Sequence, residues 1–287
     1  MIRIEDILQL SIDERLDLVE KNVPEIEALS VRTGDLGTQA HLDFLRVLLL
    51  LARGELKSAE AHLARSIDTW KAPFPWVSFF YSMLGRVQVR TGNASAAWDN
   101  FEEAVRLEPV GCYTGFDQGQ QLLGMAYAGE EVDDARMAHL KKLLPRPGTE
   151  TGAGTKVVLL CLVEALAVMG RPDEAAELYP VMQEKLDPEM VFLFDLGTVE
   201  KVAGIAASCG QRWPQAEAHF EKALIQVHEI PHRIEQAEVR RWYARMLLDR
   251  DDAGDVEKAR QLLNEALAAY KQLGMPKHVE MTEKLLS

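Results

Sequence analysis

The sequence predicts an all-α protein, built as a superhelical solenoid of about six helix pairs with capping helices at both ends. Two observations lead to this prediction. A pattern of small, bulky and small residues recurs, and its leading alanines stand at positions 59, 97, 135, 175, 216 and 259. Glycine-containing turn signals precede most copies, as in "RGE" at 53, "TGN" at 91 and "MGR" at 169. Self-similarity at a fixed period of this size is typical of proteins whose repeats stack on their neighbours.

Each copy places its small and bulky residues on one helical face, because positions four and three residues apart lie on the same side of a helix. Small residues there let a neighbouring helix approach closely, and the bulky residue fills the gap between them. The clearest copies are Ala97, Phe101 and Ala104, then Ala216, Phe220 and Ala223, then Ala259, Leu263 and Ala266. Looser copies are Ala59, Leu63 and Ser66, then Ala175, Tyr179 and Met182, and a degraded one that starts at Ala135.

The pattern divides the chain into three parts. Residues 1–36 are expected to form an N-terminal helical cap, in which Ser11 and Glu14 make a plausible capping box. Residues 276–287 are expected to form a C-terminal capping helix. Residues 37–275 should hold the six repeats, at approximately 37–70, 77–110, 116–146, 156–188, 197–230 and 234–275.

Composition argues against several classes of protein. The formal net charge of -13 is spread evenly along the chain, so a phosphate backbone would be repelled and nucleic acid is a poor partner. The most apolar run, "VVLLCLVEALAVM" from Val157, is too short to span a bilayer and contains Glu164, so we expect a buried helix. Three scattered cysteines at 112, 161 and 209 fit reduced thiols in a cytoplasmic protein.

One stretch suggests a metalloenzyme. "HEIPH" at 228–232 is the pattern in which zinc proteases hold two metal ligands and a general base. Those ligands must lie one turn apart on an unbroken helix, and Pro231 disrupts such a helix. In the aligned stretch "LGMPK" at 273–277 the two histidine positions are a leucine and a lysine, which do not bind zinc. We therefore interpret HEIPH as a link between repeats, and the sequence predicts neither a metal nor a cofactor nor an enzyme.

Two other stretches have a functional and a structural interpretation. "GTETGAGTK" at 148–156 looks like a phosphate-binding loop, but Thr155 separates the glycine from the lysine and no strand precedes it. A link between the third and fourth repeats is the favoured interpretation. The aromatic residues of "WKAPFPWVSFFY" at 70–81 could anchor a partner, although packing at the junction of the first two repeats is favoured, since bulky aromatic side chains are mostly buried.

The best copy of the unit contains Leu84 and Gly85 after Tyr81, then Ala97 and Phe101, then Pro109. On these residues the units resemble the tetratricopeptide repeat (TPR) family, over roughly residues 37 to 287. The best copy departs from the family pattern at Tyr81, where tryptophan is usual, and at Gln88, where tyrosine is usual. The resemblance implies a right-handed superhelix with a concave groove lined by the first helix of each pair.

The resemblance also implies a function, namely a non-catalytic scaffold that binds a protein or peptide in the groove. TPR proteins that grip acidic tails use lysines, arginines and amides on first-helix positions, so an acidic segment is the expected partner. Arginine suits this task because it donates two hydrogen bonds to one carboxylate. The alternative is a solvated helix face whose charges balance nearby acids. The groove positions are Arg86, Arg90, Gln118, Gln121, Glu164, Lys201, Arg241 and Arg245.

A second resemblance concerns the end of the chain. "NEALAAYKQLGMPKHVE" at 264–280 is similar to the last repeat of TPR arrays attached to bacterial signalling proteins, such as nucleotide cyclases and multidomain ATPase transcription regulators. This similarity implies an alternative function, in which the chain is the ligand- or peptide-sensing arm of a bacterial signalling or transcription-control system.

Overall fold

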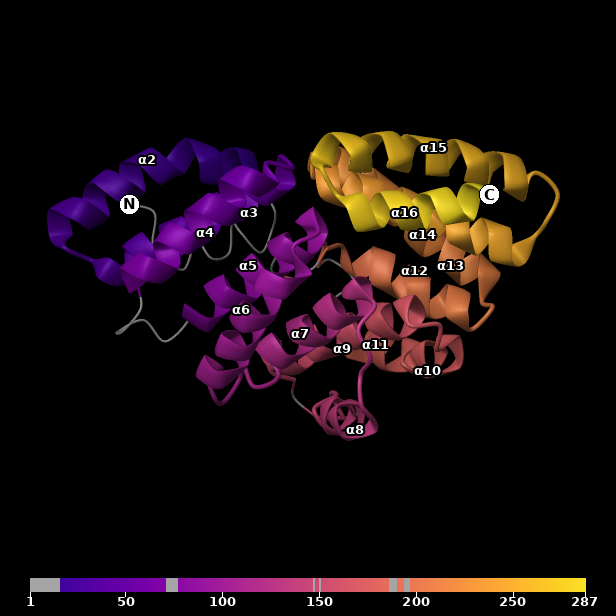
Figure 1. Ribbon diagram of the computed structural model, residues 1–287, viewed down its shortest axis with the longest axis horizontal. Helices are drawn as coiled ribbons and strands as arrows, with labels where there is room; N and C mark the ends of the chain where they lie inside the picture. The colour runs from indigo at the N-terminus through magenta and orange to yellow at the C-terminus, as the bar shows by residue number, and fades with distance from the viewer. Residues whose placement is uncertain (1–15, 71–76, 147, 150, 186–189, 194–196) are drawn as a thin grey trace.

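The computed structural model describes residues 16–70, 77–146, 148–149, 151–185, 190–193 and 197–287. The capping box expected at Ser11 and Glu14 lies outside the described residues, as do positions 71–76 of the aromatic stretch. The described part of the chain is helical apart from its links, which confirms the predicted all-α solenoid (Figure 1). The helices are α2 (Leu16–Thr33), α3 (Leu36–Ala52), α4 (Leu56–Trp70), α5 (Val77–Thr91), α6 (Ala94–Leu107), α7 (Phe116–Ala128), α8 (Asp134–Lys142), α9 (Ala153–Val168), α10 (Pro172–Glu177), α11 (Tyr179–Lys185), α12 (Val199–Cys209), α13 (Trp213–Glu229), α14 (Arg233–Arg250), α15 (Asp255–Leu273) and α16 (Pro276–Leu286).

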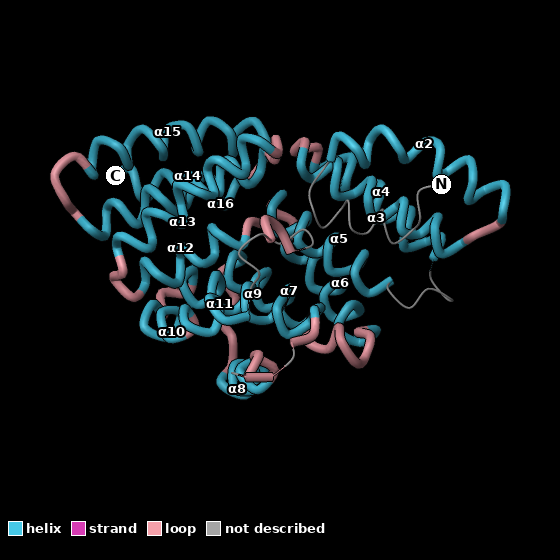
Figure 2. The backbone as a smooth tube through the Cα atoms, turned by 180° about the vertical axis from the view of Figure 1, so that it is seen from behind, coloured by secondary structure: helices cyan, strands magenta, loops and turns pink. Residues whose placement is uncertain are grey.

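Helices pack as consecutive antiparallel neighbours, and one helix of each pair also packs on the next pair. Thus α5 contacts α7, α7 contacts α9, α9 contacts α12, and α12 contacts α14. These five helices form a continuous inner layer, while α6, α13 and α15 lie on the outside of it (Figures 1 and 2). This nearest-neighbour stacking is what a repeat array requires, since one pair alone cannot bury its apolar face.

The small and bulky residues pack as the pattern predicts. Phe101 of α6 is fully buried, and its ring lies between Gly85 of α5 and Gly124 of α7. A Cβ atom added at Gly85 would meet the ring at 2.9 Å, and one added at Gly124 would meet it at 2.6 Å. Phe220 of α13 lies against Gly204 of α12 in the same way, at 3.0 Å. The glycines are therefore needed because a bulky residue of the second helix occupies the space of their missing side chains.

Two elements depart from the regular pattern, and the sequence explains one of them. The second helix of the fourth pair is broken at Leu178 into α10 and α11, because Pro180 has no N–H to donate to a carbonyl of the preceding turn. In α8 the buried residues are Met137 and Leu140. Ala135, the residue taken as the start of the degraded copy, is exposed, so that assignment of the register was wrong.

The two ends of the described array meet. Helix α3 contacts α14, and α5 contacts α16 (Figure 1). Both contacts involve a glycine turn with positive φ: Gly54, after α3, packs on Leu273, and Gly92, after α5, packs on Pro276. One hydrophobic cluster accordingly joins residues of α3, α4 and α5 to residues of α14 and α15. The superhelix is therefore closed on itself by the contacts of α3 with α14 and of α5 with α16.

The close packing of the small residues leads to a test on α13. Ala223 is fully buried, and Ala223→Leu should lower the free energy of unfolding by about 1–3 kcal/mol, because added methyl groups must displace neighbouring helices. Ala218→Leu, at an exposed position of the same helix, is the matched control and should change stability by less than about 0.5 kcal/mol. Urea denaturation followed by circular dichroism measures both. Equal effects of the two substitutions would contradict the assigned packing.

Candidate functional site

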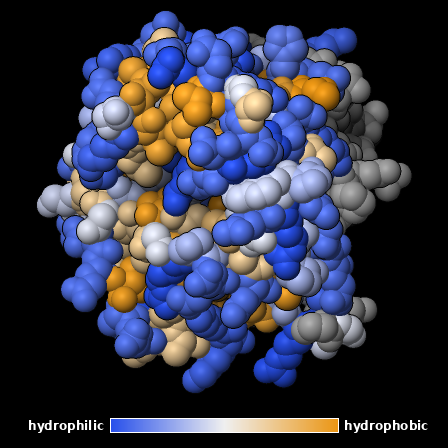
Figure 3. Space-filling model, turned by 90° about the vertical axis from the view of Figure 1, so that its right-hand side faces the viewer, coloured by the Kyte–Doolittle hydropathy of each residue, from blue (hydrophilic) through white to orange (hydrophobic). Residues whose placement is uncertain are grey.

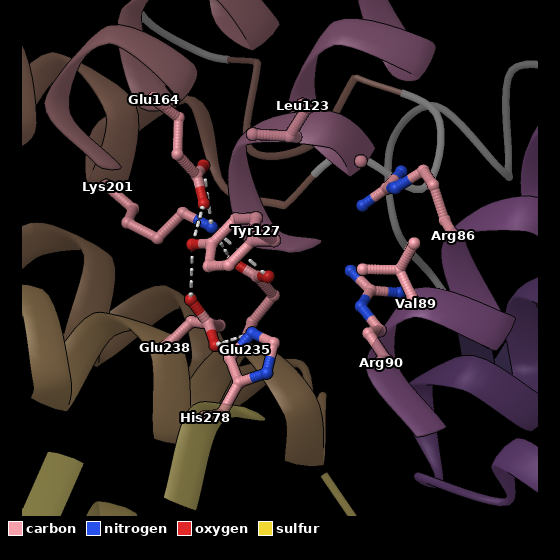
Figure 4. Close-up of a pocket in the computed structure, with 11 residues that line it drawn as sticks. Arg86, Val89, Arg90, Leu123, Tyr127, Glu164, Lys201, Glu235, Glu238 and His278 are labelled. Atoms are coloured by element: carbon pink, nitrogen blue, oxygen red, sulfur yellow. Dashed lines mark hydrogen bonds and ion pairs between the residues drawn. The ribbon is translucent and has the colours of Figure 1, made fainter. Parts of the chain in front are cut away.

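The inner layer surrounds a small cavity of about 30 Å³ (Figure 4). A polar cavity needs roughly 10–15 Å³ of such space for one water molecule, so this cavity has room for about two water molecules or one small polar head group. Helices α5, α7, α9, α12, α14 and α16 contribute to the walls. The lining residues are Arg86, Val89, Arg90, Leu123, Gly124, Tyr127, Glu164, Lys201, Glu235, Glu238 and His278.

Lys201 of α12 is the cation at one side of the cavity. Its side chain is 2% exposed, and its Nζ lies 3.3 Å from Glu164 Oε2 and 3.2 Å from Glu235 Oε2. Thr198 places it, because the Thr198 side chain accepts a hydrogen bond from the Lys201 backbone N–H at the start of α12. Burial disfavours the charge of Lys201, but Glu164 and Glu235 outweigh that effect and raise its pKa. Lys201 is therefore a buried ammonium held between two carboxylates.

Arg241 of α14 forms the second buried ion pair. Its Nη2 donates to Glu238 Oε2 at 2.8 Å and to Tyr127 Oη at 2.9 Å, and its Nε donates to Tyr270 Oη at 3.2 Å. The tyrosines act as donors in turn, Tyr127 to Glu164 Oε1 at 2.5 Å and Tyr270 to Glu238 Oε1 at 2.7 Å. Burial and the adjacent carboxylates raise the pKa of both tyrosines, so both stay protonated.

Glu238 is the carboxylate on which most of these contacts converge. Burial alone would raise its pKa, but the charges of Arg241 and Lys201 and the hydrogen bond from Tyr270 outweigh burial and hold the pKa well below its usual range. His278 Nε2 lies 3.2 Å from Glu238 Oε1, and the imidazole stacks on Tyr127 at 4.9 Å between ring centroids. Burial lowers the pKa of His278 to about 3, so the ring is neutral. We call these eight side chains the central network: Tyr127, Glu164, Lys201, Glu235, Glu238, Arg241, Tyr270 and His278.

The opposite wall of the cavity is formed by α5. Arg86 and Arg90, one helical turn apart, extend from this helix towards the central network (Figure 4). Arg86 is 6% exposed and its Nη1 lies 3.5 Å from Gln120 Oε1, whereas Arg90 is partly exposed. With His278 neutral, the central network has three carboxylates and two cations. The two arginines of α5 add two more positive charges to the lining of the cavity.

The eight predicted groove residues do not all lie together in the structure. Arg86, Arg90, Glu164 and Lys201 line the cavity, and Arg241 lies directly behind it. Gln118 instead hydrogen-bonds Glu108 and His139, at the start of α7. Arg245 lies in a separate cleft. Gln121 is buried without lining either space. The predicted positions therefore belong to more than one surface.

Several residues of the central network were not among the predicted groove positions. Glu235 and Glu238 precede the predicted Arg241 at intervals of three along α14, which places them on the same helical face as Arg241. Glu164 was among the predicted positions, and it is the one acidic residue of the largely apolar helix α9, which is a signal of a paired buried charge. Tyr127, Tyr270 and His278 give no such signal, because their role depends on helices that are distant in the sequence.

The two motifs that suggested chemistry have structural roles. Helix α13 ends at Glu229 and α14 begins at Arg233, so the two histidines of HEIPH do not share a helix; the His232 side chain caps α14 by accepting from the Glu235 N–H. In the glycine-rich stretch, Gly154 donates to Cys112 O at 2.8 Å. A Cβ at Gly154 would meet the backbone of residues 113–114 at 2.4 Å, so this glycine permits close packing at the start of α9.

Comparisons with known proteins support the repeat assignment. A model of the tetratricopeptide repeat family matches residues 157–179, which span most of α9 and all of α10. A search of curated proteins finds no match. No helix in the described part of the chain is both long and apolar enough to cross a membrane. TPR repeats generally mediate contacts between proteins, so a protein partner is the function class that the match supports.

The central network can be tested by removing one charge. Lys201→Met should lower the free energy of unfolding by about 3–5 kcal/mol, because Glu164 and Glu235 would remain buried without a cation. Lys222→Met is the matched control: Lys222 also pairs with a carboxylate, that of Glu200, but its side chain is 48% exposed, and the expected cost is below about 1 kcal/mol. Urea denaturation at neutral pH compares them. Similar losses for both variants would contradict a desolvated ion pair at Lys201.

The pH dependence of stability offers a second test. Burial raises the pKa of Asp117 to about 7 from its usual 3.8, so the folded state binds the extra proton and this group makes the protein less stable as pH rises from about 4 to 7. His278 acts in the opposite direction, because its pKa falls from 6.5 to about 3 and the unfolded state binds the extra proton. Each effect has a slope of up to about 1.4 kcal/mol per pH unit.

The two contributions oppose each other in the wild type, so single variants are needed to see them. Relative to Asp117→Asn, the wild type should lose stability between pH 4.5 and 6.5; relative to His278→Gln, it should gain stability over the same range. Chemical denaturation at several pH values gives both differences. A difference that does not change with pH would show that the substituted group has its ordinary pKa in the folded protein.

Proposed function

We propose that this protein is a non-catalytic scaffold that binds an acidic segment of a partner protein at the inner face of its helical array. The observation that carries the proposal is the position of two arginines on one wall of the cavity. Arg86 and Arg90 line the cavity from α5, opposite the central network in which Lys201 and Arg241 pair with carboxylates. The match to the TPR family supports a protein partner.

The chemistry of the wall favours a carboxylate. Two guanidinium groups one turn apart can each donate a pair of parallel hydrogen bonds to an acidic side chain or a chain terminus. The dimensions of the cavity suit one such head group with the rest of the segment outside. Partial exposure of Arg90 gives access from solvent. The net charge of -13 disfavours nucleic acid as a partner. Because the whole protein repels an acidic segment, the attraction has to come from the arginines at the site itself.

A sensing arm of a bacterial signalling system is the second candidate, and one observation favours it. Helix α5, which carries the two arginines, contacts α16, which carries His278, so the cavity lies where the two ends of the array meet. An occupant would therefore change the contact between the ends. If this is the function, the radius of gyration measured by small-angle X-ray scattering should change when the acidic peptide binds, whereas a passive scaffold should keep its dimensions.

The binding proposal is tested by titrating a library of acidic peptides with the wild type and with the double variant Arg86→Gln, Arg90→Gln. We expect peptides to bind the wild type, to bind more weakly at higher salt because the contact is ionic, and to bind the variant at least about tenfold more weakly. Isothermal titration calorimetry at low and moderate salt measures these affinities.

The matched control is Arg106→Gln. Arg106 lies on the neighbouring helix α6, is also paired with a carboxylate, that of Glu103, and is well exposed on the outer layer. This variant should bind the same peptides as tightly as the wild type. Equal binding by the double variant and the wild type would rule out the arginine wall as the site. Peptide affinities that do not change with salt concentration would rule out an acidic segment as the partner.

A further inference from the structure

Asp117, in the first turn of α7, has its carboxyl group inside the protein. Figure 3 shows hydrophilic side chains over much of one face of the molecule, where water solvates them. Asp117 by contrast is 0% exposed, and its side chain meets α5, where Ser82 Oγ donates to Asp117 Oδ1 at 2.6 Å. A buried carboxylate is unfavourable unless a cation or several hydrogen bonds compensate it. The groups around Asp117 therefore decide whether it carries a charge.

The polar atoms at this contact are not fully paired. Asp117 Oδ2, Ser78 Oγ and Gln120 Nε2 are buried, and none of the three has a hydrogen-bond partner among the residues that the structure describes. Ser78 and Ser82 are one turn apart on α5, and Asp117 and Gln120 are about one turn apart on α7, so the unpaired atoms belong to one contact between two neighbouring helices. Protein interiors rarely leave such atoms unpaired, so this contact requires an explanation.

The charged groups nearby do not neutralise Asp117. In the described part of the chain, the charged group that acts on its carboxyl is a second carboxylate, that of Glu108 in the link before α7. Glu108 Oε2 accepts the Asp117 backbone N–H at 2.8 Å, so the two acids are held close together. The first basic residue of α5, Arg86, lines the inner cavity, with its Nη1 3.5 Å from Gln120 Oε1. Helix α9 meets this part of α7 at the buried Cys161.

Burial therefore controls the ionisation of Asp117. Burial raises its pKa from 3.8 to about 7, the hydroxyls of Ser82 and Ser78 oppose burial, and Glu108 adds to its effect. The carboxyl is thus protonated in the folded protein at weakly acidic pH, and it ionises wherever water reaches it. Any local opening that exposes Asp117 releases a proton, so rising pH favours the opening by up to about tenfold per pH unit between about pH 4 and 7.

We propose that the contact between α5 and the first turn of α7 is a pH-dependent switch, which stays closed while Asp117 holds its proton and opens locally with release of that proton to water. Helix α5 also carries Arg86 and Arg90, so the switch acts on the helix that forms one wall of the inner cavity. The proposal concerns the free protein, and it is independent of the binding of an acidic segment.

The first experiment measures hydrogen–deuterium exchange at pH 5, 6 and 7, with each rate corrected for the intrinsic pH dependence of exchange. In the wild type, amides of α5 and of the first turn of α7 should lose protection by up to about tenfold per pH unit. Asp117→Asn has a similar shape and does not ionise, so its protection at these amides should stay nearly constant. Asp99→Asn, at an exposed position of α6, is the matched control and should follow the wild type.

Amides of α15 report whether the opening is local. They should show the same pH dependence in the wild type and in Asp117→Asn, because α15 does not contact α7 or α5 in the structure. An equal loss of protection at α5 and α7 in the wild type and in Asp117→Asn would overturn the proposal. A difference between the two proteins that α15 shares equally would also overturn it, since Asp117 would then act on the whole fold.

The second experiment tests whether Asp117 is the titrating group. Ser82→Ala removes a hydroxyl that favours the ionised carboxylate in the closed contact. The pH above which protection stops falling, about 7 in the wild type, should therefore rise in this variant. A purely structural role of Ser82 would change the extent of protection and leave that pH unchanged. Circular dichroism melting curves verify that the variant is folded. An unchanged or lower value in the folded variant would exclude Asp117 as the titrating group.

Discussion

Charges removed from water constrain this structure more than any other interaction. Lys201 and Arg241 are almost completely buried, and an unpaired ammonium or guanidinium at such a depth would cost several kcal/mol. Glu164 and Glu235 therefore have to reach Lys201 from α9 and α14, and Glu238 has to meet Arg241. Apolar packing alone would tolerate many small rotations of these helices. We infer that the central network selects one of them and so fixes the register of the inner layer.

The fold could be predicted from the sequence because its main determinant is local. Ala97, Phe101 and Ala104 share one helical face whatever the rest of the chain does, and all three are fully buried as their spacing indicates. The role of Gly85 also follows, since it stands on the helix that receives the Phe101 ring. Ala135 shows the limit of the method, because a degraded copy offers too few residues to fix its register.

The site was harder to predict, because its contacts join residues that are far apart in the sequence. Tyr127 and Arg241 are separated by 114 positions, and no pattern along one helix reveals that they touch. The resemblance to TPR arrays predicted Lys201 and Arg241 on the inner face, and both lie there in the structure. A count of basic residues could not show that buried carboxylates pair with both of them. Arg245 lies only four residues from Arg241, and both guanidinium groups lie over the Trp242 ring, yet Arg241 pairs with Glu238 of the central network whereas Arg245 lines a separate cleft.

Contact between the two ends changes how this array can come apart. In an open row of repeats the terminal units have one neighbour each, so unfolding starts there and proceeds inwards. Here the turn at Gly54 packs on Leu273 and the turn at Gly92 packs on Pro276. The helix pairs that begin with α3 and with α14 therefore have a neighbour on each side. Opening any single helix pair between α3 and α16 therefore breaks two interfaces, whereas α2 packs mainly on α3. This part of the protein should melt as one cooperative unit, and fraying should be confined to α2.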